Sequence, residues 1–393
     1  MKVVQINATC SSGSTGKIAL DISRLLTEAG IENYILYSHG ADGGENTVRF
    51  MGKQEGKAQA LWSRVLGNYG FNSRSATKRV IKELERIKPD VVHLHNLHTH
   101  DLHLGLLFQY FKKNKTKLYW TFHDCWAFTA YCPYFDLAGC DKWKSGCRNC
   151  SQRKQFSWFF DRSSTLYKRK KELFSGLDLT IITPSVWLKD LVAQSFLSCY
   201  PVRVINNGID LAIFRPRESD FKKGYGLEDK FVILGVAFGW GERKGLDVFK
   251  TIAERLDDRF RIVLVGTNDE IDKTLPKTII SIHRTENQEE LAKVYSAADL
   301  FINPTREENY PTVNMESLAC GTPVVTFRTG GSPEMVDETC GMIVERGDVD
   351  GMLDAILTIE KDRPFSREAC LEKAKAFDAR KRFEEYVNLY AKL

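Results

Sequence analysis

The chain has 393 residues, of which 43% are hydrophobic and 27% are charged, and its formal net charge is +5. This length predicts two domains, or three small ones, with enough apolar residues for a core in each. No run of about 18 apolar residues occurs, which excludes a membrane-spanning helix. The small positive charge gives no reason to expect nucleic acid, but it is compatible with an anionic ligand or membrane surface.

The first residues, Met1 to Ile6, read as a strand that enters the fold directly, without the apolar segment of a signal peptide. We therefore expect a cytoplasmic protein, in which the ten cysteines are thiols or metal ligands rather than disulfides. A peripheral position on the inner face of the plasma membrane is left open.

A Gly/Ser loop at residues 10–17 joins the strand at 2–8 to an amphipathic helix. By its geometry such a loop is a phosphate or carbohydrate cradle, and Gly13 and Gly16 are its candidate contacts. A P-loop is disfavoured because the G-x4-G-K pattern needs glycine where Ser11 stands. A plain strand-to-helix turn is the alternative.

Aromatic residues and arginine interleave at residues 61–71, which is typical of an acceptor or membrane-facing element, or of a packed loop. A buried strand at 90–95 follows, and five histidines fall between His93 and His103. A metal site there is disfavoured because no carboxylate or cysteine adjoins the histidines in a fixed pattern. We favour a histidine cluster at the strand end.

The next strand, residues 117–122, ends at His123-Asp124. His123 is the candidate active-site residue of the first half, and a hydrogen-bonded core histidine is the alternative. Four cysteines follow within 19 residues and end in C-x2-C; they are Cys132, Cys140, Cys147 and Cys150, with Cys125 upstream. This spacing is typical of a closed, structural zinc site. Free thiols, or less readily disulfides, are the alternatives.

Residues 152–174 read as one helical stretch that is both basic and aromatic, which suits a membrane interface with anionic lipids. A solvated helix is the alternative, and a nucleic-acid site is weaker because no nucleic-acid-binding motif accompanies the run. Turn-rich residues 206–210 then mark a domain boundary.

A second series of strands is expected at residues 231–237, 261–265, 279–282 and 300–303. Arg243 and Lys244 lie in the loop after the first of these strands. Arginine suits bidentate phosphate contacts and lysine acts as a point charge, so both are candidate phosphate ligands. Two exposed surface cations are the alternative.

The stretch 304–325 is the most informative part of the chain, because it predicts a loop, a helix over 312–319 and a further strand. Ligands bind at the carboxyl ends of strands in open α/β sheets. Glu308 precedes the helix and Glu316 lies on it, so the two carboxylates are at most about 12 Å apart. That exceeds the roughly 5–9.5 Å of a glycosidase pair. It suits hydroxyls at two ends of a ligand whose phosphates meet the helix N-terminus. A surface loop is the alternative.

This stretch resembles the E-x7-E signature of the retaining glycosyltransferases of family 4, and the match extends through residues 320–325 and 330–334. The resemblance implies an α/β protein of the GT-B fold, with two Rossmann-like domains whose parallel sheets face a central cleft. The implied domains are an acceptor-side domain at 1–208 with a cysteine insert at 125–150, a nucleotide-sugar domain at 209–376, and a helix at 377–393 that crosses back. Some bacterial polysaccharide glycosyltransferases look similar in this insert.

The resemblance also implies roles for the candidate residues. Glu308 would hold the donor sugar and Glu316 the ribose, while Phe238 stands where the family has a diphosphate-binding arginine, so that Arg243 would substitute for it. In the first half of the chain, His123 would contact the donor sugar, and Gly13 and Gly16 would face the donor. In the second half, the diphosphate would be contacted by Lys244 and by the backbone at Tyr310, Thr312 and Val313. His283 would contact the base.

The sequence therefore predicts a retaining transferase that uses a UDP- or GDP-sugar and a glycan or polyprenyl-diphosphate-linked acceptor in capsule, exopolysaccharide or O-antigen synthesis. Catalysis would need no metal, since cations stabilise the leaving diphosphate, and zinc would be structural. Peripheral contact with an anionic membrane is left open, and no nucleic acid is expected. The alternatives are a non-catalytic nucleotide-sugar or glycan sensor and, third, a P-loop-like kinase.

Overall fold

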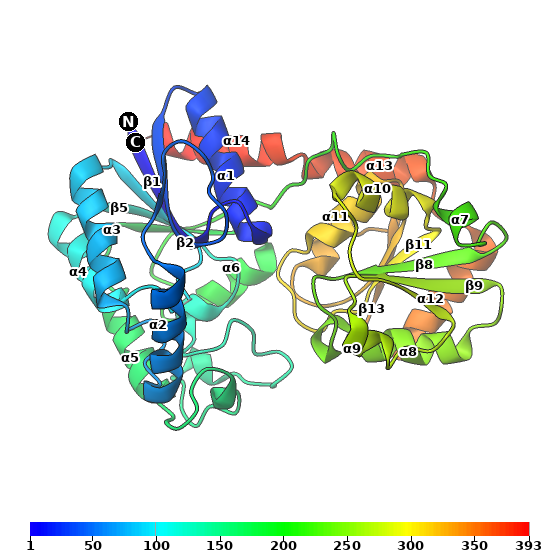
Figure 1. Cartoon of the computed structure of the whole chain (residues 1–393), viewed down its shortest axis with the longest axis horizontal. Coiled ribbons are helices and arrows are strands. Elements are labelled where there is room, and N and C mark those ends of the chain that lie inside the picture. Colours follow the sequence, from blue (N-terminus) through cyan, green and yellow to red (C-terminus); the bar gives the residue numbers. More distant parts are fainter. Residues whose placement is uncertain (99, 393) are drawn as a thin grey trace. The chain divides into compact units, whose positions relative to one another are not determined.

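The computed structural model describes residues 1–98 and 100–392, and the chain divides into two compact units (Figure 1). Unit 1 is Met1–Asn206 with Phe383–Leu393, and unit 2 is Asn207–Arg382. The second boundary therefore falls inside the last helix, α14 (Ala379–Tyr390). No helix among the described residues is long and apolar enough to cross a membrane.

Unit 1 is built on a parallel sheet in the strand order β3-β2-β1-β4-β5-β6-β7. Its strands are β1 (Lys2–Thr9), β2 (Glu32–His39), β3 (Thr47–Arg49), β4 (Val91–Leu94), β5 (Lys117–Thr121), β6 (Leu179–Thr183) and β7 (Val202–Val204). The order changes direction between β1 and β4, and such a switch point opens a crevice at the carboxyl ends of the strands. The loops after β1, β4 and β5 meet there.

Helices cover both faces of this sheet. They are α1 (Gly13–Glu28), α2 (Lys53–Leu66), α3 (Arg74–Ile87), α4 (Leu104–Asn114), α5 (Ser163–Leu173) and α6 (Val186–Ala193). Alternate strand residues such as Val92 and Leu118 pack with α3 and α4, which lie together on one side of the sheet in Figure 1. The opposite face meets α14, because the hydroxyl of Tyr390 lies 2.5 Å from His93 Nδ1 and the ring of Tyr386 stacks on His93.

Unit 2 repeats this plan with the strand order β10-β9-β8-β11-β12-β13. Its strands are β8 (Phe231–Val236), β9 (Phe260–Val265), β10 (Ile279–Ile282), β11 (Leu300–Asn303), β12 (Val324–Phe327) and β13 (Gly341–Val344). Its helices are α7 (Phe221–Gly224), α8 (Leu246–Arg255), α9 (Asp269–Asp272), α10 (Gln288–Ala297), α11 (Thr312–Ala319), α12 (Val349–Asp362) and α13 (Arg367–Ala374). One sheet face packs Leu234 and Phe301 with Met315 of α11, and the other packs Ile233 with α8 and α12. The expected pair of Rossmann-like domains with parallel sheets is confirmed.

One local expectation was wrong. The aromatic and basic run at 152–174 does not form one helix, because a short 3₁₀ turn (Arg153–Gln155) and an extended loop precede α5. Asp161 accepts the N–H of Ser163, the first residue of α5, at 2.9 Å. In the segment 61–71, for which a packed loop was one alternative, residues 61–66 are the end of α2 and residues 67–71 are not helical. Helix α2 ends where Gly67 adopts a left-handed conformation.

Candidate active site

The candidate donor site lies at the switch point of unit 2. Strands β8, β11 and β12 are adjacent and parallel, so the loops that follow them emerge at the same edge of the sheet. These loops carry Arg243 and Lys244, then Glu308, and then Gly330. The side chains that the sequence singled out in this half therefore come from neighbouring loops.

Lys244 and Glu308 contact each other directly. The Lys244 Nζ atom lies 2.5 Å from Glu308 Oε2, and the two side chains are only 20% and 16% exposed. The second carboxylate oxygen of Glu308 accepts the backbone N–H of Asn309 at 3.2 Å. Partial burial strengthens an ion pair relative to a surface one, so this pair fixes the carboxylate beside the ammonium.

Arg243 is part of the connection between the first two loops. Its guanidinium donates to the carbonyl of Glu307 at 3.2 Å, and its own carbonyl accepts the N–H of Arg306 at 2.8 Å. Arg306 in turn holds Asp247 through two bonds of 2.7 and 2.5 Å. This bidentate pair lowers the pKa of Asp247. The pair of Arg306 and Asp247 was not predicted from the sequence, where the one indication of it is an acidic residue in the first turn of α8.

Two glycines allow the loops to approach each other. Gly245 has φ +75°, and a Cβ atom there would lie 2.4 Å from the Pro304 carbonyl oxygen. Gly330 has φ +55°, and a Cβ atom there would lie 1.8 Å from the Glu308 carbonyl oxygen. Both positions exclude larger side chains by conformation and by space. The backbone that carries Glu308 is thus held from the third loop as well.

The N-terminus of α11 opens beside these loops. The preceding residue, Pro311, provides no capping side chain. The first N–H groups of a helix have no intrahelical partner, so those of Thr312 and Val313 form a potential anion site. One turn later, the buried Glu316 accepts the hydroxyl of Tyr295 at 3.1 Å. Tyr310, which precedes the helix, is buried in the apolar core of unit 2.

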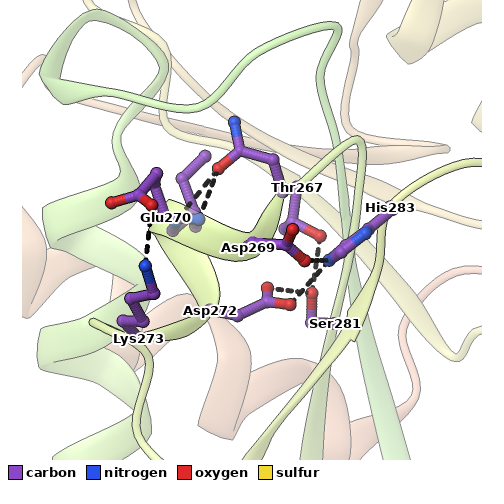
Figure 2. Close-up of polar contacts among 9 residues, drawn as sticks. Thr267, Asp269, Glu270, Asp272, Lys273, Ser281 and His283 are labelled. Atoms are coloured by element: carbon purple, nitrogen blue, oxygen red, sulfur yellow. Dashed lines mark hydrogen bonds and ion pairs between the residues drawn. The ribbon is translucent and has the colours of Figure 1, made fainter.

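His283 lies in a hydrogen-bonded network at the ends of β9 and β10 (Figure 2). Its Nε2 atom is 2.6 Å from Asp272 and 3.9 Å from Asp269, and Asp272 also accepts the hydroxyl of Ser281 at 2.5 Å. The bond to Asp272 raises the pKa of His283. Sequence analysis missed Asp272, which fixes the imidazole that it assigned to the base.

Among the residues that the structure describes, Asp269, Asp272 and His283 are also the one group of three potential metal ligands whose ligand atoms all lie within 4.8 Å of one another. The group is largely exposed, and the imidazole of His283 already pairs with both carboxylates. At the end of β8, Phe238 is fully exposed at the position where the resemblance implies an arginine. A solvent-exposed aromatic ring at a strand end is a candidate ligand contact that sequence analysis did not assign.

In unit 1, the two glycines of the first loop differ in their surroundings. Gly13 has φ +69° and nothing within 4 Å of a Cβ position. A Cβ atom at Gly16 would lie 2.6 Å from the Cys10 carbonyl oxygen and 2.8 Å from Thr9 Oγ1. Gly16 therefore allows α1 to pack closely on the end of β1, and its contact with a ligand stays a prediction.

The histidines after β4 and β5 form a connected array in unit 1. His123 Nε2 lies 3.2 Å from His95 Nδ1, and His95 Nε2 lies 2.9 Å from Gln5. Burial lowers the pKa of His123 to about 4 and that of His93 to about 3. These imidazoles are therefore neutral at pH about 7. His98 differs, because its pair with Asp124 at 2.8 Å raises its pKa.

The four clustered cysteines lie on the loop between β5 and α5. Burial raises the pKa of Cys132 to about 12 and that of Cys147 to about 11, and the neighbouring cysteines add to both shifts. The four thiols are thus near neighbours, and none of the ten cysteines, all of which the structure describes, forms a disulfide. No three of their sulfurs come within 4.8 Å of one another among the described residues. The sulfurs are spread more widely than a closed zinc shell requires.

Comparisons with known proteins agree with this geometry. The sequence profile of "Glycosyltransferase Family 4" matches residues 15–213, just over half of the chain, and that of "Glycosyl transferases group 1" matches residues 228–362. The chain belongs to glycosyltransferase family 4. This glycosyltransferase is thus an enzyme, and not the sensor that was the alternative.

One relative and two solved structures match over the whole length of the chain, and a second relative matches over part of it. The glycosyltransferase is 24% identical to the putative colanic acid biosynthesis glycosyl transferase WcaC of Escherichia coli, over 100% of both chains. It is also 24% identical to the sulfoquinovosyl transferase SQD2 of Arabidopsis thaliana, over 77% of this chain and 57% of that protein. The structure of Anabaena Alr3699/HepE in complex with UDP superposes with a TM-score of 0.73 at 15% identity, over 100% of both chains. Sucrose-phosphate synthase of Thermosynechococcus elongatus gives 0.72 at 16% identity, over 100% of this chain and 98% of that chain. These likenesses show the GT-B fold.

Proposed function

We propose that this glycosyltransferase moves a hexose, with retention of anomeric configuration, from a UDP- or GDP-sugar to a glycan or polyprenyl-diphosphate-linked acceptor in surface polysaccharide assembly. The similarity to a colanic acid glycosyl transferase supports the pathway class. The UDP-bound structural neighbour and the E-x7-E pattern support the donor class and retention. In unit 1, His123 is our candidate for contact with the transferred sugar.

The observation that carries the proposal is the contact between Lys244 and Glu308 beside the N-terminus of α11. When the bond between sugar and diphosphate breaks, negative charge develops on the diphosphate. Lys244, Arg243 and the helix N–H groups supply positive charge at that place. A bound diphosphate competes for Lys244, which releases the Glu308 carboxylate to accept the sugar hydroxyls.

Three buried polar atoms on the adjoining segments lack a hydrogen-bond partner within the protein, namely Asn314 Nδ2 on α11 and Thr329 Oγ1 and Ser332 Oγ after β12. Buried polar groups are nearly always paired. Their position on two of the elements that we assign to the donor is consistent with a polar ligand there.

The test is a panel of nucleotide-sugars, screened first by thermal shift and then for slow hydrolysis. We expect one donor to stabilise the protein and to be hydrolysed, and Glu308→Gln to lower the hydrolysis rate at least a hundredfold while the fold is kept. Glu345→Gln, which changes an exposed carboxylate paired with Arg328, is the matched control. Binding without turnover by any donor would contradict the proposal. The anomer of the transferred sugar, read by NMR, tests retention separately.

We also propose that Cys132, Cys140, Cys147 and Cys150 hold a structural zinc ion. The support beyond the thiols is Lys170, which is fully buried and donates to the carbonyls of Trp126 and Thr129 at 2.8 and 3.0 Å. Burial lowers the pKa of Lys170, and nearby Cys147 and Cys132 oppose that shift.

A buried cation needs a compensating charge. Zinc with four thiolates carries two net negative charges, so Lys170 beside the cluster fits that site. Bound zinc would lend stability to the loop and leave no open position. Closing the shell draws the sulfurs together, since metal binding and local folding are coupled.

A further inference from the structure

Unit 1 exposes an apolar patch formed by two segments that are far apart in the sequence. The first segment is the C-terminal half of α2, and the second is the loop after residue 156. The patch consists of Leu61, Trp62, Leu66, Trp158, Phe159 and Phe160, each between 38% and 63% exposed. Contiguous apolar surface of this kind marks interaction sites.

Backbone contacts hold the two segments side by side. The N–H of Trp158 donates to the Arg64 carbonyl at 2.9 Å, and a Cβ atom at Gly67 would lie 3.2 Å from the Phe160 carbonyl oxygen. The buried hydroxyl of Ser157 donates to the Phe160 carbonyl at 2.7 Å. The loop is thus fixed underneath while its aromatic side chains face solvent, so their exposure belongs to the folded state.

Cations outnumber carboxylates around the patch. Residues 53–66 and 153–162 carry six cations, which are Lys53, Lys57, Arg64, Arg153, Lys154 and Arg162, against the two carboxylates of Glu55 and Asp161. Glu55 pairs with Arg79, and Asp161 accepts two backbone N–H groups. The guanidinium of Arg162 lies 5.6 Å from the Phe160 ring. A second copy of the chain would bring like charges together, whereas an anionic lipid surface offers both the apolar and the charged complement.

We propose that the apolar patch is a docking surface for an anionic lipid bilayer. It consists of Leu61, Trp62, Leu66, Trp158, Phe159 and Phe160. The tryptophan and phenylalanine rings enter the interfacial region of the bilayer, and the surrounding lysine and arginine side chains contact the headgroups.

The position of the patch also deepens the proposed function, on which the following step rests. A cavity of about 480 Å³ lies along the same helix, lined by Lys53 and Lys57 of α2 and by Asp101, whose carboxylate pairs with His39 at 2.9 Å. Docking through α2 brings this cavity to the lipid surface. Its two lysines suit the phosphates of a lipid-linked acceptor.

The test is co-sedimentation with vesicles of phosphatidylcholine alone and of equal parts phosphatidylcholine and phosphatidylglycerol. We expect the full chain to bind the anionic vesicles at low salt and to be released by added salt. The triple variant Trp62→Ser, Trp158→Ser, Phe159→Ser should bind at least tenfold more weakly. Leu357→Ser, which changes an exposed leucine of α12 in unit 2, should bind as the unchanged protein does.

Equal vesicle binding by the triple variant would overturn the proposal, as would a dimer in solution that the triple variant abolishes. Hydrolysis of the soluble donor should be unchanged in the triple variant, which separates docking from the donor site. If no donor is hydrolysed while anionic vesicles are still bound through these residues, the proposed function fails and the docking surface stands.

Discussion

At the scale of single residues, the ion pair between Lys244 and Glu308 can serve the stability of the fold or the chemistry of the donor site. Replacing Lys244 alone leaves the largely buried Glu308 carboxylate without its partner, so some stability is lost whatever the role of the lysine. Only a lysine that stabilises the leaving diphosphate also controls the rate of the folded enzyme. We predict that Lys244→Met lowers the rate of donor hydrolysis by about 10²–10³, the usual effect of removing one electrostatic contact to the transition state.

The control for this prediction is Lys250→Met. Lys250 is a partly exposed lysine of the following helix, and its ammonium donates to the hydroxyl of Thr274 at 2.8 Å. Rates measured at saturating donor separate the chemical step from binding. An unchanged rate in Lys244→Met, with the thermal unfolding of both variants equal, would remove Lys244 from the mechanism.

Gly330 supports a second prediction at this scale. A Cβ atom there would lie 1.8 Å from the Glu308 carbonyl oxygen, and the residue has φ +55°. We predict that Gly330→Ala displaces the loop that carries Glu308 and lowers donor hydrolysis at least tenfold. Gly347→Ala is the matched control, because Gly347 also has a positive φ but has open space at its Cβ position. Equal loss in both variants would assign the effect to backbone strain rather than to this loop contact.

At the scale of elements, the cysteine loop between β5 and α5 has little regular structure to hold it. We predict that purified protein contains one zinc ion per chain and that Cys147→Ser loses it, with a lower midpoint of thermal unfolding. Cys199→Ser, at an exposed cysteine outside the cluster, should keep the zinc ion and the midpoint of thermal unfolding of the unchanged protein. Elemental analysis gives the zinc content, and cobalt substitution gives the absorption of tetrahedral thiolate ligation. Zinc-free protein with unchanged stability would contradict the site.

Elements of the two sheets were predictable where an apolar run was bounded by turn residues, as at 231–237 and 300–303. The sequence analysis did not predict β3 and β13. Each is only three or four residues long, and β13 begins at a glycine, which is unfavourable in strands. Helix α2 was missed because Trp62 and Leu66 are exposed, so its apolar residues do not follow one buried face.

Within the candidate site, the sequence could name residues but not their partners. Glu308 and Lys244 are separated by 64 positions, and their contact depends on the order of β8 and β11 in the sheet. The pair Arg306–Asp247 depends on the same strand order, and the pair His283–Asp272 depends on the pairing of β9 with β10. Such contacts leave no local pattern, whereas the loop and helix that carry Glu308 and Glu316 form one continuous stretch.

At the scale of the whole molecule, the histidines of unit 1 make stability depend on pH. Burial lowers the pKa of His93 to about 3 and that of His123 to about 4, while in the unfolded chain both are near 6.5. Between these values the unfolded chain binds more protons, so the free energy of unfolding rises with pH. The stabilising contribution is complete above pH about 6.5 and is lost as the pH falls toward the native pKa values. His39, whose pKa is raised by Asp101, acts in the opposite direction.

Because His93, His95 and His123 are all shifted downward, we predict that the midpoint of thermal unfolding falls when the pH is lowered from about 7 to about 5. His93→Gln should reduce the size of this fall, even though the variant loses the bond to Tyr390 and is less stable at both pH values. His283→Gln is the control, since this exposed histidine has a raised pKa and its loss should not reduce the fall. Differential scanning calorimetry at the two pH values measures all three proteins. A fall in His93→Gln as large as that of the unchanged protein would mean that the burial of His93 does not contribute to the pH dependence in this range.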